Sequence, residues 1–234
     1  MTDSAGDAYP STPAKRRRNV WKTAARKYAI PILPGEWQVL TATLILRPFG
    51  FIARGVGAND RTLGIILEPL FMPLDYEPAA WTVAPGSYVP GVFPYHRLSF
   101  HESEAEKYMH DLAGAVVETV LPYITENGSL EGYFDLCRRY NADHPNQLGN
   151  PHILYRQAAT AVILERPEDA ERAARAVQEA IDAHPTDDRD WVRRLHEQAG
   201  AFRNRLIADP AALKAELISG MDEQKRRRKL PLSG

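Results

Sequence analysis

The stretch FGFIARGVGANDRTLGIILEPLFMPL, residues 49–74, decides the fold. Two apolar runs flank residues 57–60, GAND, which form a turn signal, so the stretch predicts a β-hairpin. The second run, residues 61–74, is almost wholly apolar, which predicts a strand inside the sheet rather than at its edge. Pro69 and Pro73 are expected to end its pairing, because proline cannot donate a ladder hydrogen bond.

Weaker signals lie on either side of this hairpin. The segment WQVLTATLILR, residues 37–47, mixes helical spacing with β-branched residues, and we predict a single strand there. Residues 75–100 contain so many prolines and glycines that only a short strand around 81–83 is expected. Before the sheet, a short helix is predicted to start at Asn19 and to end near Pro31.

After Phe100 the apolar pattern becomes helical. Residues 102–126 keep a helical period, and Pro122 predicts a kink or break near the end of that helix. Capping and proline signals predict further helix starts at Ser129, Pro151, Pro167, Asp188 or Asp190, and Asp209-Pro210, the last helix running into the basic tail. Because strands and helices are segregated, we predict an α+β fold: a small antiparallel sheet over about residues 37–90, then a helical bundle with antiparallel helix hairpins.

The predicted domain organisation follows these changes of pattern. Its parts are a basic-ended polar tail at 1–18, a strand-rich unit with one leading helix at 19–100, a helical unit at 101–222, and a basic tail at 223–234. The first tail has too few apolar residues to repay the entropy of ordering it. We therefore exclude it from the predicted fold.

Composition limits the class of protein. The chain of 234 residues has 29 Lys and Arg against 30 Asp and Glu, so its net charge of -1 points to no particular partner. Cys137 is the only cysteine, which excludes an intramolecular disulfide and favours a reducing compartment. No apolar run approaches the roughly 18–20 residues that span a bilayer, and the amino terminus lacks a signal-peptide core. We expect a soluble cytoplasmic protein without membrane association.

One pair of predicted helices resembles a tetratricopeptide-type hairpin. With that template started at Leu154, its small, apolar and terminating positions hold Ala161, Ala173, Val177, Ala180 and Pro185. Its aromatic and leucine positions hold Gln157 and Thr160 instead, and flanking repeats are missing, whereas a solenoid needs about three. An ordinary antiparallel helix hairpin is therefore expected.

Histidines and acids gather at the start of the helical half. Glu106 and His110 are one helical turn apart and would share a helix face, an arrangement suited to acid–base work. His101 and His110 are too far apart in the sequence for the paired histidines of a zinc-binding helix, so we predict no metal site. Acids also gather at helix starts simply because they complement the dipole. An enzyme remains an alternative function, with its site dispersed over His96, His101, Glu104, Glu106 and His110.

Two further signals favour structural explanations. Gly55-x-Gly57 precedes a strand and lacks a lysine, so it indicates a turn rather than a phosphate loop. Cys137 lies on the apolar face of its predicted helix, which favours a buried thiol over a nucleophile. Without a catalytic motif, we expect no cofactor and no catalytic activity.

The basic residues Lys225, Arg226, Arg227, Arg228 and Lys229 could attract nucleic-acid phosphates. No aromatic residues alternate with them, so the stacking component of single-strand recognition is missing. A solvated tail, or cations that complement the end of a helix, would explain them equally well. A nucleic-acid-associated protein that uses its basic termini is therefore the second alternative.

The order of hairpin and helices, with the stretch LEPLFMPLDY at 67–76, is similar to uncharacterised bacterial accessory proteins found beside toxin or defence genes. No residue role follows from this resemblance. The prediction for function is a non-catalytic protein-binding or accessory module of a soluble bacterial type. Its expected partner is another protein, because helical hairpins commonly serve as contact surfaces.

Overall fold

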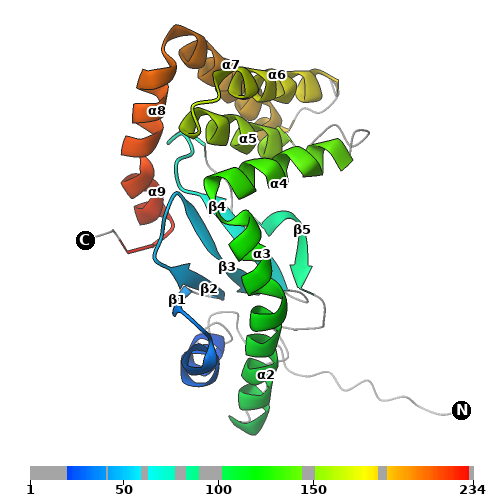
Figure 1. The fold of residues 1–234 in the computed structure, drawn as a ribbon, viewed down its shortest axis with the longest axis vertical. Helices are drawn as coiled ribbons and strands as arrows, with labels where there is room; N and C mark the ends of the chain where they lie inside the picture. Colours follow the sequence, from blue (N-terminus) through cyan, green and yellow to red (C-terminus); the bar gives the residue numbers. More distant parts are fainter. Residues whose placement is uncertain are drawn as a thin grey trace, which may run out of the picture.

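The protein combines one antiparallel sheet with a bundle of helices, which confirms the predicted α+β class (Figure 1). The computed structural model describes residues 20–40, 42–58, 63–76, 83–89, 102–143, 151–183 and 189–231. The sheet lies in the middle of the molecule, with helices α4 to α8 at one end and the first helical turns at the other (Figure 1).

The described sheet is a five-stranded meander in the order β1-β2-β3-β4-β5, with every neighbouring pair antiparallel. Its strands are β1 (Glu36–Leu40), β2 (Thr43–Arg47), β3 (Ile52–Ala58), β4 (Leu63–Pro69) and β5 (Val83–Val89). The predicted hairpin is confirmed, because β3 pairs with β4 in a register that sets Ala58 opposite Leu63. The turn itself, residues 59–62, lies outside the described residues. As predicted, β4 is an inner strand that ends at Pro69.

Two strand predictions need correction. The single strand predicted at 37–47 is wrong: β1 and β2 form a hairpin in which Leu40 pairs with Thr43. Its turn contains no glycine, proline or asparagine, so the sequence carries no turn signal there. Of the short strand predicted around 81–83, Val83 begins β5, which continues through Pro85 to Val89, while Trp81 and Thr82 lie outside the described residues. In the described sheet β5 is the last strand of the order, and proline is tolerated on an edge strand.

Both faces of β4 are covered, which explains its continuous apolar run. Leu63, Ile65 and Leu67 belong to the main core, which they share with the helices. Ile66 points to the opposite face, where it packs with Leu230 and with Ile45, Ala53 and Leu70. Because neighbouring residues of a strand face opposite sides, a strand covered on both sides carries apolar residues on both of its faces.

The first helices contain irregular turns. Residues 20–24 are α-helical and continue into the π-helical turn η1 (Ala25–Ala29) and the 3-10 turn η2 (Ile30–Ile32). Helix α2 (Glu102–Ala115) passes through the π-helical turn η4 (Val116–Val120) into α3 (Leu121–Asn127). A kink or break was predicted near Pro122; the structure shows a π-helical turn just before that residue, and the helix continues to Asn127.

The remaining helices are α4 (Leu130–Asp143), α5 (Pro151–Ile163), α6 (Pro167–Asp182), α7 (Asp190–Ala208), α8 (Pro210–Ser219) and α9 (Met221–Arg227). Two predicted caps are confirmed: the amide of Gly132 donates to Ser129 Oγ at 3.0 Å, and that of Ala212 to Asp209 Oδ1 at 2.9 Å. Asp190 is the first residue of α7 rather than its cap, and Asp188 lies outside the described residues. The last predicted helix does not run unbroken into the basic tail, because Gly220 separates α8 from α9.

Helices α5 and α6 form the expected antiparallel hairpin. Ala161, Ala173, Val177 and Ala180 are buried in it, which allows the two helices to approach closely, while Pro185 lies outside the described residues. Residues of the strand-rich and helical parts share a single core cluster, which extends from Trp21 to Leu217. Within the part of the chain that the structure describes, no helix has both the length and the apolar character needed to cross a membrane.

Candidate functional site

The acid–base candidates lie on the outside of α2. Glu104, Glu106 and His110 are all exposed, while His96 and His101 lie outside the described residues. The structure therefore brings Glu106 and His110 to one region of surface, and neither of them lines the two hollows described below. Among the described residues, no three His, Cys, Asp or Glu side chains are grouped in a way that could hold a metal ion. The dispersed enzyme site stays a prediction.

The basic residues near the carboxyl end are partly built into the fold. Lys225 is buried and lies 3.1 Å from Asp222, and Arg226 lies 3.0 Å from Glu223. Arg227 and Arg228 contact Glu223 and Glu68, respectively, whereas Lys229 is exposed. A nucleic-acid interface at this cluster also stays a prediction, with Arg226, Arg227 and Lys229 as its exposed members.

A buried polar network connects the sheet to the helices, and we call it the Glu68 network. It consists of Glu68, Arg156, Arg228, Tyr76 and His152. Arg228 donates to one oxygen of Glu68 at 2.6 Å, and a guanidinium nitrogen of Arg156 lies 3.6 Å from the other. Arg156 Nε donates to the Tyr76 hydroxyl at 3.3 Å, which lies 3.1 Å from His152 Nδ1.

Burial shifts the pKa values of several groups in and near this network. Burial, with a smaller effect of the Arg156 cation, lowers the pKa of His152 to about 4, so the imidazole is neutral. Burial raises the pKa of the Cys137 thiol to about 12, which removes its nucleophilic form. Burial also raises the pKa of Tyr76. We interpret the Glu68 network as a structural junction of β4, α5 and the carboxyl-terminal segment.

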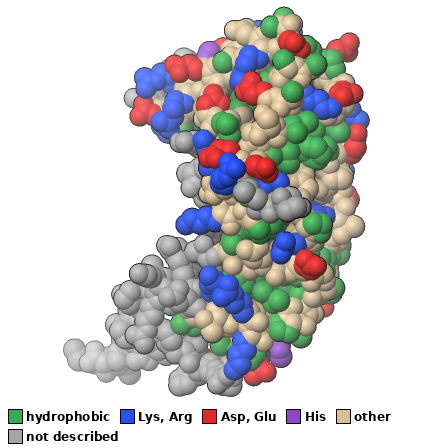
Figure 2. All heavy atoms as spheres, turned by 90° about the vertical axis from the view of Figure 1, so that its left-hand side faces the viewer, with side chains coloured by type: hydrophobic (Ala, Val, Ile, Leu, Met, Phe, Trp, Pro, Cys, Tyr) green, Lys and Arg blue, Asp and Glu red, His purple; other side chains and the backbone are tan. Residues whose placement is uncertain are grey.

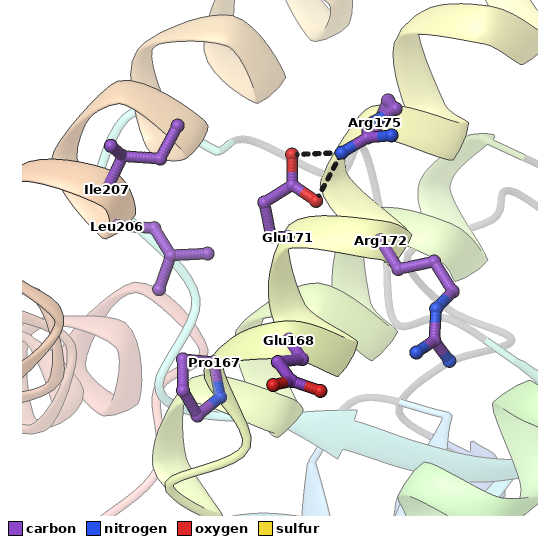
Figure 3. Close-up of a pocket in the computed structure, with 7 residues that line it drawn as sticks. All are labelled: Pro167, Glu168, Glu171, Arg172, Arg175, Leu206 and Ile207. Atoms are coloured by element: carbon purple, nitrogen blue, oxygen red, sulfur yellow. Dashed lines mark hydrogen bonds and ion pairs between the residues drawn. The ribbon is translucent and has the colours of Figure 1, made fainter.

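The accessible candidate site is a groove on the helical bundle, which we call the α6–α8 groove. Its first hollow, of about 460 Å³, lies between α6 and α7 and is lined by Pro167, Glu168, Glu171, Arg172, Arg175, Leu206 and Ile207 (Figure 3). Its second hollow, of about 470 Å³, is lined by Val162, Glu165, Arg166, Pro167, Leu206, Pro210, Ala211, Lys214, Ala215 and Ile218. The two hollows share Pro167 and Leu206, so they adjoin along one surface.

Helix α8 explains why this surface is apolar. Leu213 and Leu217 point into the core, while Ala211, Ala215 and Ile218 line the second hollow. An amphipathic surface helix would place charged residues on this outer side. Figure 2 shows hydrophobic side chains gathered over the upper part of the face that carries α8.

Large apolar side chains stand open to solvent at the groove. Ile207 is 63% exposed at the end of α7, and Ile218 is 40% exposed on α8. In Figure 3, Leu206 and Ile207 lie on one side of the first hollow, with Pro167 and the α6 residues on the other. An exposed apolar surface rimmed by charges is typical of a contact site for another molecule.

Ion pairs hold the rim of the groove in place. Glu171 accepts from Arg175 at 2.7 Å and from Arg203 of α7 at 2.9 Å, which links α6 to α7. Lys214 of α8 donates to Glu165 at 2.6 Å, in the turn between α5 and α6. These ion pairs connect α6 to α7, and α8 to the turn between α5 and α6.

Comparison with known proteins gives no assignment, since no protein-family model, curated protein or solved structure matches this chain. The site is therefore interpreted from its own geometry. Neither the groove nor the Glu68 network was predicted from the sequence. Two features of the sequence could have indicated them. Glu68 is a single acid in an otherwise apolar strand, and α8 carries apolar residues on its outer side.

Proposed function

We propose that the protein is a non-catalytic protein-binding module whose contact surface is the α6–α8 groove. The observation that carries this proposal is the pair of adjoining apolar hollows with Ile207 and Ile218 exposed beside them. Covering these side chains would remove apolar surface from water, at about 25 cal/mol per Å². Its charged rim and apolar floor resemble the anatomy of protein–protein contact surfaces.

The state of the reactive groups also supports a binding role. His152 and Cys137 are the described residues with the chemistry of a base and a nucleophile that lie near the Glu68 network. At neutral pH the Cys137 thiol is protonated and fully buried, and His152, whose pKa is lowered to about 4, is only a weak base. The groove, in contrast, is open to a partner and ordered by ion pairs.

Capture from lysate of the native cells tests this function with a matched pair of variants. Ile207→Asp places a charge in the groove, whereas Ile32→Asp places the same charge at η2, at the opposite end of the molecule (Figure 1). Both isoleucines are more than half exposed, at 63% and 52%, so neither change should unfold the protein. We expect a protein partner whose recovery falls at least about tenfold with Ile207→Asp, a loss of about 1.4 kcal/mol, but not with Ile32→Asp.

The same experiment includes nuclease treatment, to separate a protein partner from nucleic-acid tethering. Equal recovery of every captured protein by both variants would contradict the proposal. So would capture of nucleic acid alone, lost on nuclease treatment.

A further inference from the structure

In each ion pair around the α6–α8 groove, one ion is more exposed to solvent than the other. The sign of the more exposed ion differs between the two hollows of the groove. In each pair, the ion that stands farther into solvent is the one that an approaching partner meets first. The less exposed ion lies beneath it. The relative exposure of the two ions therefore decides the sign presented at each part of the rim.

At the first hollow the outer ions are cations. Arg172 is 75% exposed and its partner Asp169 only 34%. Arg175 is 54% exposed, whereas its partner Glu171 is 25% exposed and is also bound by Arg203. Two guanidinium groups thus face solvent along α6, with their counter-charges below them.

At the second hollow the order is reversed, and the outer ions are acids. Glu165 is 76% exposed, while its partner Lys214 is 29% exposed. Glu131 is 59% exposed and its partner Arg166, which lines the hollow, is 38% exposed. Glu168 is an exposed acid that lines the first hollow, and it lies beside Pro167, the residue of α6 that both hollows share (Figure 3).

We infer that the α6–α8 groove binds an amphipathic protein segment with two charged ends. Its apolar side chains cover Ile207 and Ile218, its acidic end lies over Arg172 and Arg175, and its basic end lies over Glu131 and Glu165. This inference rests on the proposed function and names the chemistry of the partner. A segment whose two ends carry the same charge would meet like charges at one end of the groove. Charged interfaces reject wrong partners through such repulsion between like charges.

Designed helical peptides test the inference without knowledge of the natural partner. Three fluorescent peptides share one leucine face and differ in their flanks: glutamate at one end and lysine at the other, glutamate at both ends, or lysine at both ends. Fluorescence anisotropy measures the binding of each to the full chain. We expect the peptide with mixed ends to bind about tenfold more tightly than either of the others, with the difference shrinking as salt is raised.

Two charge-reversal variants should exchange these preferences. Arg172→Glu with Arg175→Glu makes both ends of the groove acidic, so the lysine-flanked peptide should become the tightest ligand. Glu131→Lys with Glu165→Lys makes both ends basic and should favour the glutamate-flanked peptide. Far-ultraviolet circular dichroism confirms that each variant is folded, which is expected because exposed ion pairs contribute only about 0–1 kcal/mol each.

The outcomes separate this inference from the proposed function. If all peptides bind within twofold of one another, and Ile207→Asp still abolishes their binding, the charge polarity is wrong while the groove remains a docking site. If no peptide binds, or if Ile207→Asp leaves binding unchanged, both proposals fall. A preference that fails to exchange in the charge-reversal variants would also overturn the inference.

Discussion

Arg228, just after the last helix, donates a hydrogen bond of 2.6 Å to Glu68 on the buried strand β4. The second oxygen of the same carboxylate lies 3.6 Å from Arg156 of α5. One acid thus holds the carboxyl-terminal segment and the helical bundle to the sheet. Around it, the amide of Gln224 donates to the backbone oxygens of Met72 and Pro73, so the segment is attached at several points.

Loss of the Glu68 carboxylate should be costly. Glu68→Gln leaves Arg156, which is 2% exposed, without this counter-charge, and we expect a loss of about 3–5 kcal/mol in the free energy of unfolding. Arg228→Gln should cost only about 1–2 kcal/mol, because Glu68 keeps Arg156 and Arg228 is closer to solvent. Urea unfolding at neutral pH measures both. An equal or larger cost for Arg228→Gln would contradict the role given to Glu68.

Substitution of glycine by alanine should have opposite effects on stability at two positions. A Cβ atom at Gly55 of β3 would lie 2.2 Å from the backbone oxygen of Leu44 on β2, so Gly55→Ala must push the strands apart. We expect it to destabilise the protein by about 2–3 kcal/mol. At Gly114, exposed in α2, a Cβ atom would meet nothing within 4 Å, and Gly114→Ala should stabilise by about 0.5–1 kcal/mol. Thermal melts of both variants check the expected opposite signs.

Acid should weaken the fold through His152. Its folded-state pKa of about 4 lies below the ordinary 6.5, so the folded protein binds the proton less readily than the unfolded chain does. The stability due to the neutral imidazole is present above pH 6.5 and is lost as the pH falls toward 4.

His152→Gln removes this titration while keeping a polar group beside Tyr76. Between about pH 7 and pH 5, the unmodified protein should lose about 1–2 kcal/mol more stability than the variant. Urea titrations of both proteins at each pH give this difference. Parallel losses would show that His152 titrates normally in the folded state.

Leu230 should stabilise the sheet, whereas its neighbour Lys229 should not. Leu230 is buried against Ile45, Ala53 and Ile66, so Leu230→Ala should cost about 2–3 kcal/mol. Lys229 is exposed, and Lys229→Gln should leave stability unchanged. Chemical unfolding distinguishes the two, and a similar cost for both would mean that the segment does not pack as described.

This contrast also shows how to test the nucleic-acid alternative. Deleting residues 224–234 would remove Gln224 and Leu230 from the fold together with the charges. Arg226→Gln with Lys229→Gln removes exposed cations alone. Salt-sensitive DNA binding that falls in this double variant would support the alternative, because each lost phosphate contact lowers the salt dependence. If the unmodified protein shows no detectable binding to DNA, the nucleic-acid alternative is ruled out.

Local chemistry explains which elements were predictable. The β3–β4 hairpin was marked by glycine and asparagine, and α4 and α8 by Ser129 and Asp209, whose side chains accept hydrogen bonds from the helix amides. The β1–β2 turn was missed because it forms without such residues, and its pairing is stabilised by the rest of the sheet. Tertiary packing outweighed the local pattern there.

The sites could not be predicted because they join distant parts of the chain. Glu68 and Arg228 are 160 positions apart, and no spacing rule connects them. The α6–α8 groove depends on how α5, α6, α7 and α8 pack, and Ile207 and Ile218 fall outside the buried stripes of their helices. Helix periodicity predicts which face is buried, but not where the packed helices leave a hollow.

Photo-crosslinking in the native cells tests the binding claim most directly. Ile207 and, as a control, Ile32 are each replaced by a benzophenone amino acid, which reacts only with a molecule in direct contact. The account predicts a discrete protein adduct from position 207 that is lost when Ile218→Asp is added, and no such adduct from position 32. The same adducts from both positions, or none from position 207, would contradict the assignment of the α6–α8 groove as the contact surface.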